Sequence, residues 1–513
     1  MQDRVNKITH VINRLMPLLL AYSYLFMIAP VAHSQQAGAI NGPLRVSTLN
    51  SRYFTDNSGK AIALSGSHTW GNFVDVGPSN NNLPSGLDNI STTATVEGFV
   101  QYLDFLKKYN HNFIRLWRWE LTYWKRYTDL KYRYSSPHPW KRTGPGSAKD
   151  GLLKFDLKQF EQSYFDRLRE RVIAAGNRGI YVSVMLFEGN ALYFPEYDTW
   201  VGHPYNINNN VNNINGDLNS DGQGVEIHTL SNSQIVAFQE AYVRKVIDTV
   251  NDLDNVLYEV GNEIGSYSIP FQYHIINLVK SYEKTKPKQH PIGMTHCYHR
   301  DTKYWSTHQD LRNSPADWIS PGGEVVQTAD YVTNPVVNDG KKVVLADNDH
   351  LGWRQRDAAW LWKIFMRGHS PIWMDAYFGL NGNGPWLYDM QADIEKIRKY
   401  QGYILTYATK MNLIAMVPSN SASDCSTTYC LRNPGKEYFI YQPTSSTAFS
   451  VNLVSGSYTY EWFNLLTGSI AQTGSFSASS GNRNFTPPFA GEALLYIKSS
   501  STTDATAPAA PTG

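Results

Sequence analysis

An Asn-Glu pair at the end of an apolar run is the part of this sequence best suited to chemistry. The run "NVLYEVGNEIG" spans residues 255–265 and contains Asn262 and Glu263. A carboxylic acid with a raised pKa can protonate an oxygen as the bond to that oxygen breaks. We therefore interpret Glu263 as a general acid/base and Asn262 as an amide that holds a substrate hydroxyl group. The alternative is a helix-capping Asn beside a solvent-facing Glu.

The elements that must position this pair alternate regularly along the chain. Short apolar runs typical of buried parallel strands recur between segments with helical spacing. The expected strands lie within 53–70, 111–120, 180–189, 255–265, 290–299, 341–353 and 370–378, and the expected helices within 96–110, 160–179, 233–251, 271–284 and 356–368. About eight strands before residue 380 predict an α/β fold of the (β/α)8 TIM barrel type. A doubly wound sheet is the alternative, but "LSGSHTWGN" is not its glycine-rich phosphate turn.

The segment "YEVGNEIG" resembles the fourth strand of clan A glycoside hydrolases, whose Asn-Glu pair supplies the acid/base. The resemblance covers roughly residues 45–415 and implies these roles for Asn262 and Glu263. "NFIRLWRW" is similar to the clan's second strand, which implies that Arg115 supports the second catalytic carboxylate. The resemblance implies a glycoside hydrolase that cleaves O-glycosidic bonds by a two-carboxylate mechanism, without a cofactor.

The second carboxylate is expected in "KKVVLADNDHLGW", at the end of the seventh strand. Asp347 stands where the clan usually has Glu. Because Asp is one methylene shorter, retention and inversion of the anomeric configuration both stay open. We predict that Asp347 is the second catalytic group and that Asp349 is the alternative. We also expect Asp349 and His350 to contact substrate. The non-catalytic interpretation of Asp347 is an Asx-turn that caps the next helix.

Further substrate contacts are expected at the carboxyl ends of the strands, because that face of a barrel carries the active site. The candidates are Trp117, Glu188, His296, Tyr298, Trp373 and Asp375. The resemblance implies a substrate-contacting His or Tyr near the fifth strand and a Trp platform on the eighth. Each of these side chains could equally fill the barrel or its rim.

The polar segment 203–228 is expected to form a long loop on the active-site face. Asp217, Asn219 and Asp221 match the start of a calcium loop, but His228 replaces its usual final Glu. A structural calcium ion and a turn-rich loop are the two interpretations. No catalytic metal is expected, since the sequence has no "HExxH" motif and no Cys/His cluster. It also has no "GxSxG" elbow and no P-loop, so serine esterase and nucleotide chemistry lack support.

The two ends of the chain differ in composition from the barrel, which we place at residues 35–415. Residues 1–34 combine a positive start, an apolar run and small residues, which predicts a signal peptide and a secreted or periplasmic protein. An uncleaved anchor is the alternative. Residues 416–498 contain short alternating runs and predict an antiparallel β-sandwich accessory domain, followed by a linker over 499–513. This domain resembles the collagen-binding-type β domain that often follows such barrels. Packed against the last barrel helix, it would brace the barrel.

Composition narrows the class of partner. The 46 Lys and Arg residues nearly balance the 44 Asp and Glu residues, so no basic field exists to bind nucleic acid. The 14 Trp and 33 Tyr residues suit stacking on sugars. Cys425 and Cys430 predict a local disulfide, and Cys297 predicts a buried thiol rather than a nucleophile. We expect a monomer that binds carbohydrate and, after signal cleavage, no membrane. The rivals are a non-catalytic carbohydrate-binding or adhesion protein on a degenerate barrel, and a transglycosylase on the same fold.

Overall fold

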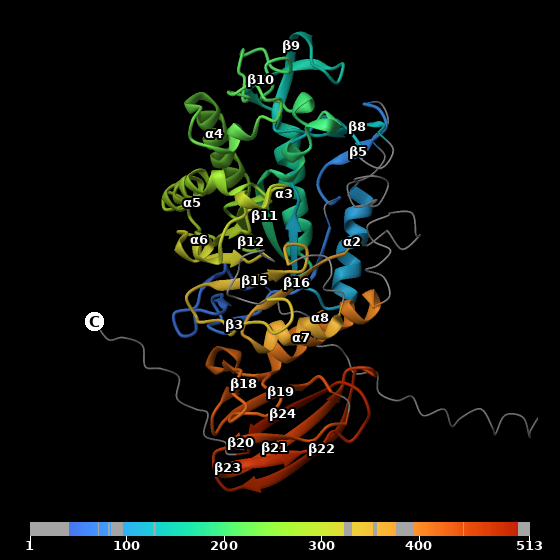
Figure 1. The fold of residues 1–513 in the computed structure, drawn as a ribbon, viewed down its shortest axis with the longest axis vertical. Helices are drawn as coiled ribbons and strands as arrows, with labels where there is room; N and C mark the ends of the chain where they lie inside the picture. The colour runs from blue at the N-terminus through green and yellow to red at the C-terminus, as the bar shows by residue number, and fades with distance from the viewer. Residues whose placement is uncertain are drawn as a thin grey trace, which may run out of the picture. The chain divides into compact units, whose positions relative to one another are not determined.

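The computed structural model describes residues 40–69, 71–80, 83, 96–126, 130–322, 331–351, 357–375, 393–444 and 446–500 (Figure 1). All of them belong to one compact unit, residues 36–513. The predicted signal peptide lies outside the described residues, as do residues 501–513 of the predicted linker. In the part of the chain that is described, every helix is too short or too polar to span a lipid bilayer.

Eight parallel strands form the central sheet, which confirms the predicted (β/α)8 barrel. In chain order they are β4 (Ser67–His68), β6 (Phe113–Leu116), β11 (Tyr181–Glu188), β12 (Val256–Asn262), β13 (Ile292–Thr295), β14 (Trp318–Ser320), β15 (Val343–Asp347) and β16 (Ser370–Met374). The sheet runs from β4 through β16 down to β11 and β6. Asn112 joins its two ends, because its N–H donates to Ser65 O at 3.1 Å and its Oδ1 accepts from Ser65 N at 3.0 Å.

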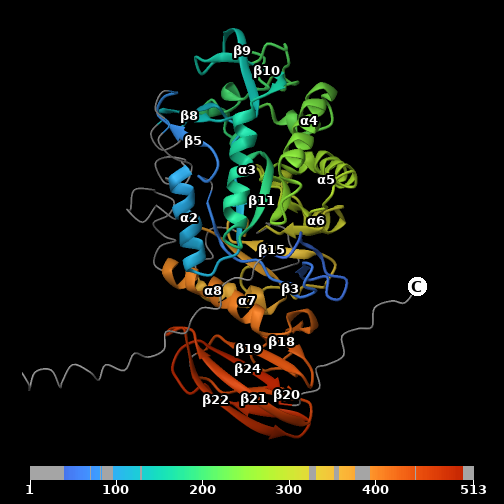
Figure 2. The same ribbon diagram turned by 180° about the vertical axis from the view of Figure 1, so that it is seen from behind.

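Helices surround this barrel (Figures 1 and 2). They are α2 (Val96–Lys108), α3 (Gln162–Gly176), α4 (Ser233–Val250), α5 (Ile269–Glu283), α6 (His308–Asn313), α7 (Ala358–Met366) and α8 (Ile394–Lys410). Five of them lie where helical spacing predicts a helix. Every residue of β11 and of β12 is buried, as expected for strands covered on both faces. The register pairs Glu188 with Asn262, so the carboxyl ends of these two strands lie at one level.

The barrel interior is layered, with charge between two apolar layers. The lower layer contains Phe113, Leu257 and Ile372, and the upper layer contains Trp117, Met185 and Met374. Between them, Arg115 on β6 donates to Glu259 on β12, with Nε 3.0 Å from Oε2. Alternation along each strand places every second side chain inside the barrel, which is why Arg115 and Trp117 share the interior.

The connections that follow β6 and β11 form structure that the sequence pattern does not predict. A small sheet combines β5 (Asp75–Gly77), β7 (Tyr123–Lys125) and β8 (Tyr132–Ser136), and a hairpin combines β9 (Trp140–Ser147) and β10 (Leu153–Phe160). Short 3-10 helices follow β11: η3 (Asn190–Tyr193), η4 (Pro195–Tyr197), η5 (Trp200–Gly202) and η6 (Val225–His228). Others are η7 (Ser266–Ser268), η8 (Thr302–Tyr304) and η11 (Leu413–Ala415). Before the barrel, β1 (Arg45–Val46), β2 (Phe54–Thr55) and β3 (Ala61–Ile62) form an antiparallel sheet.

The C-terminal region consists of two antiparallel sheets, as predicted. The larger contains β17 (Val417–Ser419), β18 (Cys430–Asn433), β19 (Glu437–Gln442), β24 (Ala493–Ser499), β21 (Gly456–Asn464) and β22 (Ser469–Ala478); the smaller contains β20 (Phe449–Leu453) and β23 (Gly481–Phe485). The larger sheet packs on α7 and α8 (Figure 2). The ring centroids of Tyr407 on α8 and Phe439 lie 4.8 Å apart, and Trp362 on α7 lies 6.1 Å from Phe439. Tyr407 also donates to Glu461 at 2.8 Å.

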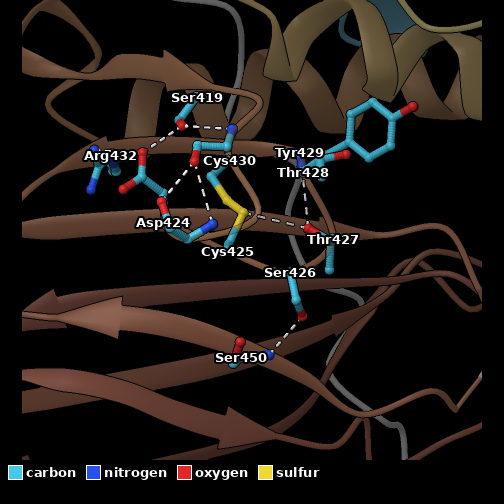
Figure 3. Close-up of a disulfide and its surroundings, with 12 residues drawn as sticks. Ser419, Asp424, Cys425, Ser426, Thr427, Thr428, Tyr429, Cys430, Arg432 and Ser450 are labelled. Atoms are coloured by element: carbon cyan, nitrogen blue, oxygen red, sulfur yellow. Dashed lines mark hydrogen bonds and ion pairs between the residues drawn. A yellow bond between two sulfur atoms is a disulfide. The ribbon is translucent and has the colours of Figure 1, made fainter.

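The predicted local disulfide joins Cys425 and Cys430, whose Cα atoms are 6.6 Å apart (Figure 3). Asp424 beside it accepts from Ser419 Oγ at 2.6 Å and pairs with Arg432. Cys297 is buried, and burial raises the pKa of its thiol to about 12. A thiol with so high a pKa is a poor nucleophile, which agrees with the prediction of an inert buried thiol.

Candidate active site

Glu263 follows directly on β12, at the carboxyl end of the fourth barrel strand. Its φ is +46°, an uncommon backbone conformation for a residue with a side chain, and such conformations cluster at functional sites. The side chain is partly exposed and accepts a hydrogen bond from Asn190 Nδ2. Burial, followed by the negative charge of Asp349, raises the pKa of Glu263 to about 8. This carboxyl group therefore retains its proton at neutral pH.

Asn262 lies at the centre of a buried hydrogen-bond network. Its Oδ1 accepts from Arg115 Nη2 at 2.8 Å and lies 3.0 Å from His350 Nε2. Because an amide oxygen only accepts, His350 must carry its proton on Nε2, and Nδ1 then accepts from Ser320 Oγ at 3.3 Å. Burial lowers the pKa of His350 to about 3, so the ring is neutral. With Oδ1 occupied, Nδ2 is the group that remains for the substrate contact predicted for Asn262.

Asp347 ends β15 and lies beneath the surface, with a side chain that is 0% exposed. His68 Nε2 lies 2.9 Å from its Oδ2, and Arg115 Nη1 donates to the same oxygen at 3.0 Å. Burial alone would raise the pKa of Asp347, but its interactions with His68, and then with His350 and Arg115, hold this pKa well below its usual range. Asp347 is therefore a buried anion whose charge is compensated by the Arg115 guanidinium.

Asp349 occupies a different position from Asp347. It is partly exposed, and its N–H donates to Asp347 Oδ1 at 3.0 Å. One carboxylate oxygen of Asp349, one of Glu263 and one nitrogen of His350 lie within 4.8 Å of one another. Burial, with the charge of Asp347, raises the pKa of Asp349 to about 6. Two carboxyl groups with raised pKa values thus face each other at the mouth of the barrel.

Glu263, Asp349 and His350 are residue types that can bind a metal ion, but the hydrogen bonds of His350 do not favour a metal site here. Both nitrogens of His350 already have partners, so neither presents a lone pair to an ion. In the candidate calcium loop, Asp217 accepts from the backbone N–H of Asp221 at 3.1 Å and of Gly222 at 2.9 Å. These contacts are those of a turn, and a calcium ion held by Asp217, Asn219 and Asp221 stays a prediction.

Three further candidates lie close to the site. Trp117 stacks on the His68 ring with centroids 6.2 Å apart, and its buried Nε1 has no hydrogen-bond partner among the described residues. His296 Nδ1 lies 3.2 Å from Ser306 Oγ, and burial lowers the pKa of this imidazole to about 3. Burial raises the pKa of Tyr298, as do the charges of Glu263 and Asp349. Contact of these side chains with substrate stays a prediction.

Trp373 and Asp375 are less well placed for the roles predicted for them than Glu188. Glu188 lies beside Asn262 in register, both are 1% exposed, and contact of Glu188 with substrate stays a prediction. Trp373 on β16 is 0% exposed and packs edge-on against Trp360 of α7, with centroids 6.0 Å apart. Asp375 pairs with Arg398 of α8. Alternation along β16 turns both Trp373 and Asp375 outward from the barrel interior, so the structure gives no support to a sugar platform there.

Sequence reasoning missed His68 and Glu259, two buried groups of this network. Glu259 lies within the fully buried strand β12 and accepts from Arg115 Nε and Nη2. A charged residue inside a buried strand must be paired, so "YEVGNE" already signalled a partner for Glu259. His68 carried no comparable signal, because its closeness to Asp347 depends on the pairing of β4 with β16.

Comparisons with known proteins agree with this fold. Residues 133–303 match DUF6298, a family described as a domain of unknown function. No curated protein matches the sequence. A solved structure called "Glycoside hydrolase" is similar at a TM-score of 0.56 and 13% identity, over 91% of this chain and 99% of that chain. A glycoside hydrolase family 5 protein from Bacteroides vulgatus is similar at a TM-score of 0.50 and 12% identity, over 91% of this chain and 96% of that one. The chain therefore has a TIM-barrel fold of the kind found in glycoside hydrolases.

Proposed function

We propose that this protein hydrolyses O-glycosidic bonds in a poly- or oligosaccharide, with Glu263 as the general acid/base. The observation that supports the proposal is the pair of facing carboxyl groups of Glu263 and Asp349, which lie within 4.8 Å at the carboxyl end of the barrel. Two-carboxylate hydrolysis needs one protonated and one ionised group at the same pH. The pKa values of about 8 for Glu263 and about 6 for Asp349 meet that need near neutral pH.

The roles of the neighbouring groups follow from their contacts. Glu263 donates its proton to the oxygen of the leaving sugar, and the aspartates at 347 and 349 supply the second carboxylate. Asn262 donates through Nδ2 to a hydroxyl of the sugar. Arg115 holds Asn262 and Asp347 at fixed positions through the hydrogen bonds of one guanidinium group. The reaction as proposed needs water but no cofactor.

The proposed setting is outside the cytoplasm, in the medium or the periplasm, after removal of residues 1–34. The protein would act there on carbohydrate as a monomer, without nucleic acid or membrane as a partner. We propose that the β-sandwich braces the barrel. The aromatic contacts of Phe439 with Tyr407 and Trp362 support this role, because they bury the outer faces of α7 and α8.

A non-catalytic carbohydrate-binding protein is the second candidate, and the Asp at position 347 is the observation in its favour. Strongly raised carboxyl pKa values are more typical of catalytic sites, where an acid must keep its proton beside an ionised group. The raised pKa of Glu263 therefore favours hydrolysis over binding alone.

The test is a glycan screen that measures released reducing ends for the wild type and Glu263→Gln. We expect the wild type to cleave one class of glycan and the Gln variant to lose about 10²–10⁴-fold in rate. Glu170→Gln, at an exposed position on α3, is the matched control and should keep the full rate. Binding of a glycan without release of sugar by any of the three proteins would favour the binding protein instead.

A further inference from the structure

We infer that Asp349 is the catalytic nucleophile and that Asp347, at the strand end, is a positioning residue. The inference rests on the proposed function and adds the residue that bonds to the sugar. It also departs from the sequence prediction, which favours Asp347.

Asp347 lacks the access that a nucleophile needs. A reacting oxygen must approach the anomeric carbon to about 3–3.5 Å with a free lone pair. The Asp347 side chain is 0% exposed, and its Oδ2 is held between His68 Nε2 and Arg115 Nη1. Its Oδ1 accepts the N–H of Asp349 at 3.0 Å. Both oxygens therefore have partners inside the protein, and burial closes the approach to the lone pair that Oδ1 still has.

Asp349 has the access that Asp347 lacks. The residue is partly exposed, and one of its oxygens lies within 4.8 Å of an oxygen of Glu263. Carboxyl groups about 5–5.5 Å apart belong to retaining enzymes, whereas inverting enzymes keep about 6.5–9.5 Å for a water molecule. One oxygen of Glu263 and one of Asp349 lie within 4.8 Å of each other, nearer the retaining spacing than the inverting one, which supports direct attack by Asp349.

The two steps balance with water as the only co-reactant. An Asp349 oxygen bonds to the anomeric carbon as the glycosidic C–O bond breaks, and the Glu263 proton passes to the leaving oxygen. The ionised Glu263 then takes a proton from water, whose oxygen bonds to the anomeric carbon and releases Asp349 as carboxylate. The sugar leaves with its original anomeric configuration.

Asp347 acts on this reaction through Asp349. Its charge is one cause of the raised pKa of Asp349, and its Oδ1 fixes the backbone from which Asp349 projects. His68 and Arg115 in turn hold Asp347. The arrangement accounts for an Asp at the strand end, since the reacting carboxylate is supplied two residues later.

The test uses the wild-type protein and a 2-deoxy-2-fluoro glycoside, with an activated leaving group, of the sugar that the glycan screen identifies. Such a compound allows the covalent intermediate to form and slows its hydrolysis. Peptide mass spectrometry then locates the sugar. We expect the label on Asp349. A label on Asp347, or hydrolysis of substrate with inversion and no label, would overturn the inference while the proposed function stands. A wild type that cleaves no glycan would refute the proposed function itself.

Two variants provide an independent measurement. We expect Asp349→Ala to lose about 10⁴-fold or more in rate and to regain activity with sodium azide, which attacks the anomeric carbon from the vacated side and gives a glycosyl azide. Asp347→Asn should be slower than wild type without azide rescue and should shift the acid limb of the pH profile downward, because the charge that raises the pKa of Asp349 is gone. Azide rescue of the Asp347 variant alone would refute the assignment.

Discussion

Removing the amide of Asn190 should make Glu263 hold its proton to a higher pH. Asn190 Nδ2 donates to Glu263 Oε2, and a donor to a carboxylate favours the charged form. This hydrogen bond is the chief contact that lowers the pKa of Glu263 against burial and the charge of Asp349. Glu263 acts as an acid only when protonated, so activity falls as the pH rises through its pKa. In Asn190→Ala that fall should occur at higher pH.

The size of the shift follows from the strength of the lost contact. A hydrogen bond to a charged group contributes about 1.5–3 kcal/mol, and partial exposure of Glu263 places this one at the lower end. Since about 1.4 kcal/mol corresponds to a tenfold change in proton affinity, the alkaline limb should move upward by about one pH unit.

The assay is the pH profile of kcat/KM for a glycoside with an unactivated leaving group, in wild type and in Asn190→Ala. The wild-type limb is expected near the pKa of about 8. Asn208→Ala, an exposed position in the same connection, is the control and should leave the limb in place. An activated leaving group needs no proton, so its profile should lose the alkaline limb in all three proteins.

The position of the limb, and not the absolute rate, decides this prediction. A weaker Asn190→Ala enzyme with an upward-shifted limb still agrees with the reasoning. A limb that stays in place or moves downward would show that Asn190 does not stabilise the ionised Glu263, or that another group governs the alkaline side.

Three other perturbations test the packing that surrounds the site. Asp375→Ala removes the carboxylate that pairs with the buried Arg398 guanidinium, and should lower the free energy of unfolding in urea by about 3–5 kcal/mol. Trp362→Ala leaves a cavity between α7 and the β-sandwich. It should lower the free energy of unfolding by about 3–5 kcal/mol, which is measured as a lower thermal midpoint. Removing the disulfide with Cys425→Ala and Cys430→Ala should lower the free energy of unfolding by about 2 kcal/mol. Reduction of the disulfide in the wild type should lower it by the same amount. Unchanged stability would contradict the contact concerned.

Much of the scaffold was predictable because it depends on local pattern. Helical spacing located α3 and α4 to within a few residues, and apolar runs located seven of the eight barrel strands. The sixth strand, Trp318–Ser320, has three residues and is too short to show a pattern. The small sheet and the hairpin that follow β6 were not predicted from the sequence for another reason. Their pairings, such as Tyr123 with Tyr134, join short polar segments whose order the sequence does not reveal.

The sequence alone determined the barrel class and placed Asn262 and Glu263 at the end of its fourth strand, because both depend on the order of residues along one strand. Only the tertiary structure decided how the two aspartates differ. Asp347 and Asp349 are two residues apart, yet His68 and Arg115 reach the first from other strands and leave the second facing Glu263. The pKa, access and chemical role of a carboxyl group are set by the side chains and solvent around it, and those neighbours come from distant parts of the chain.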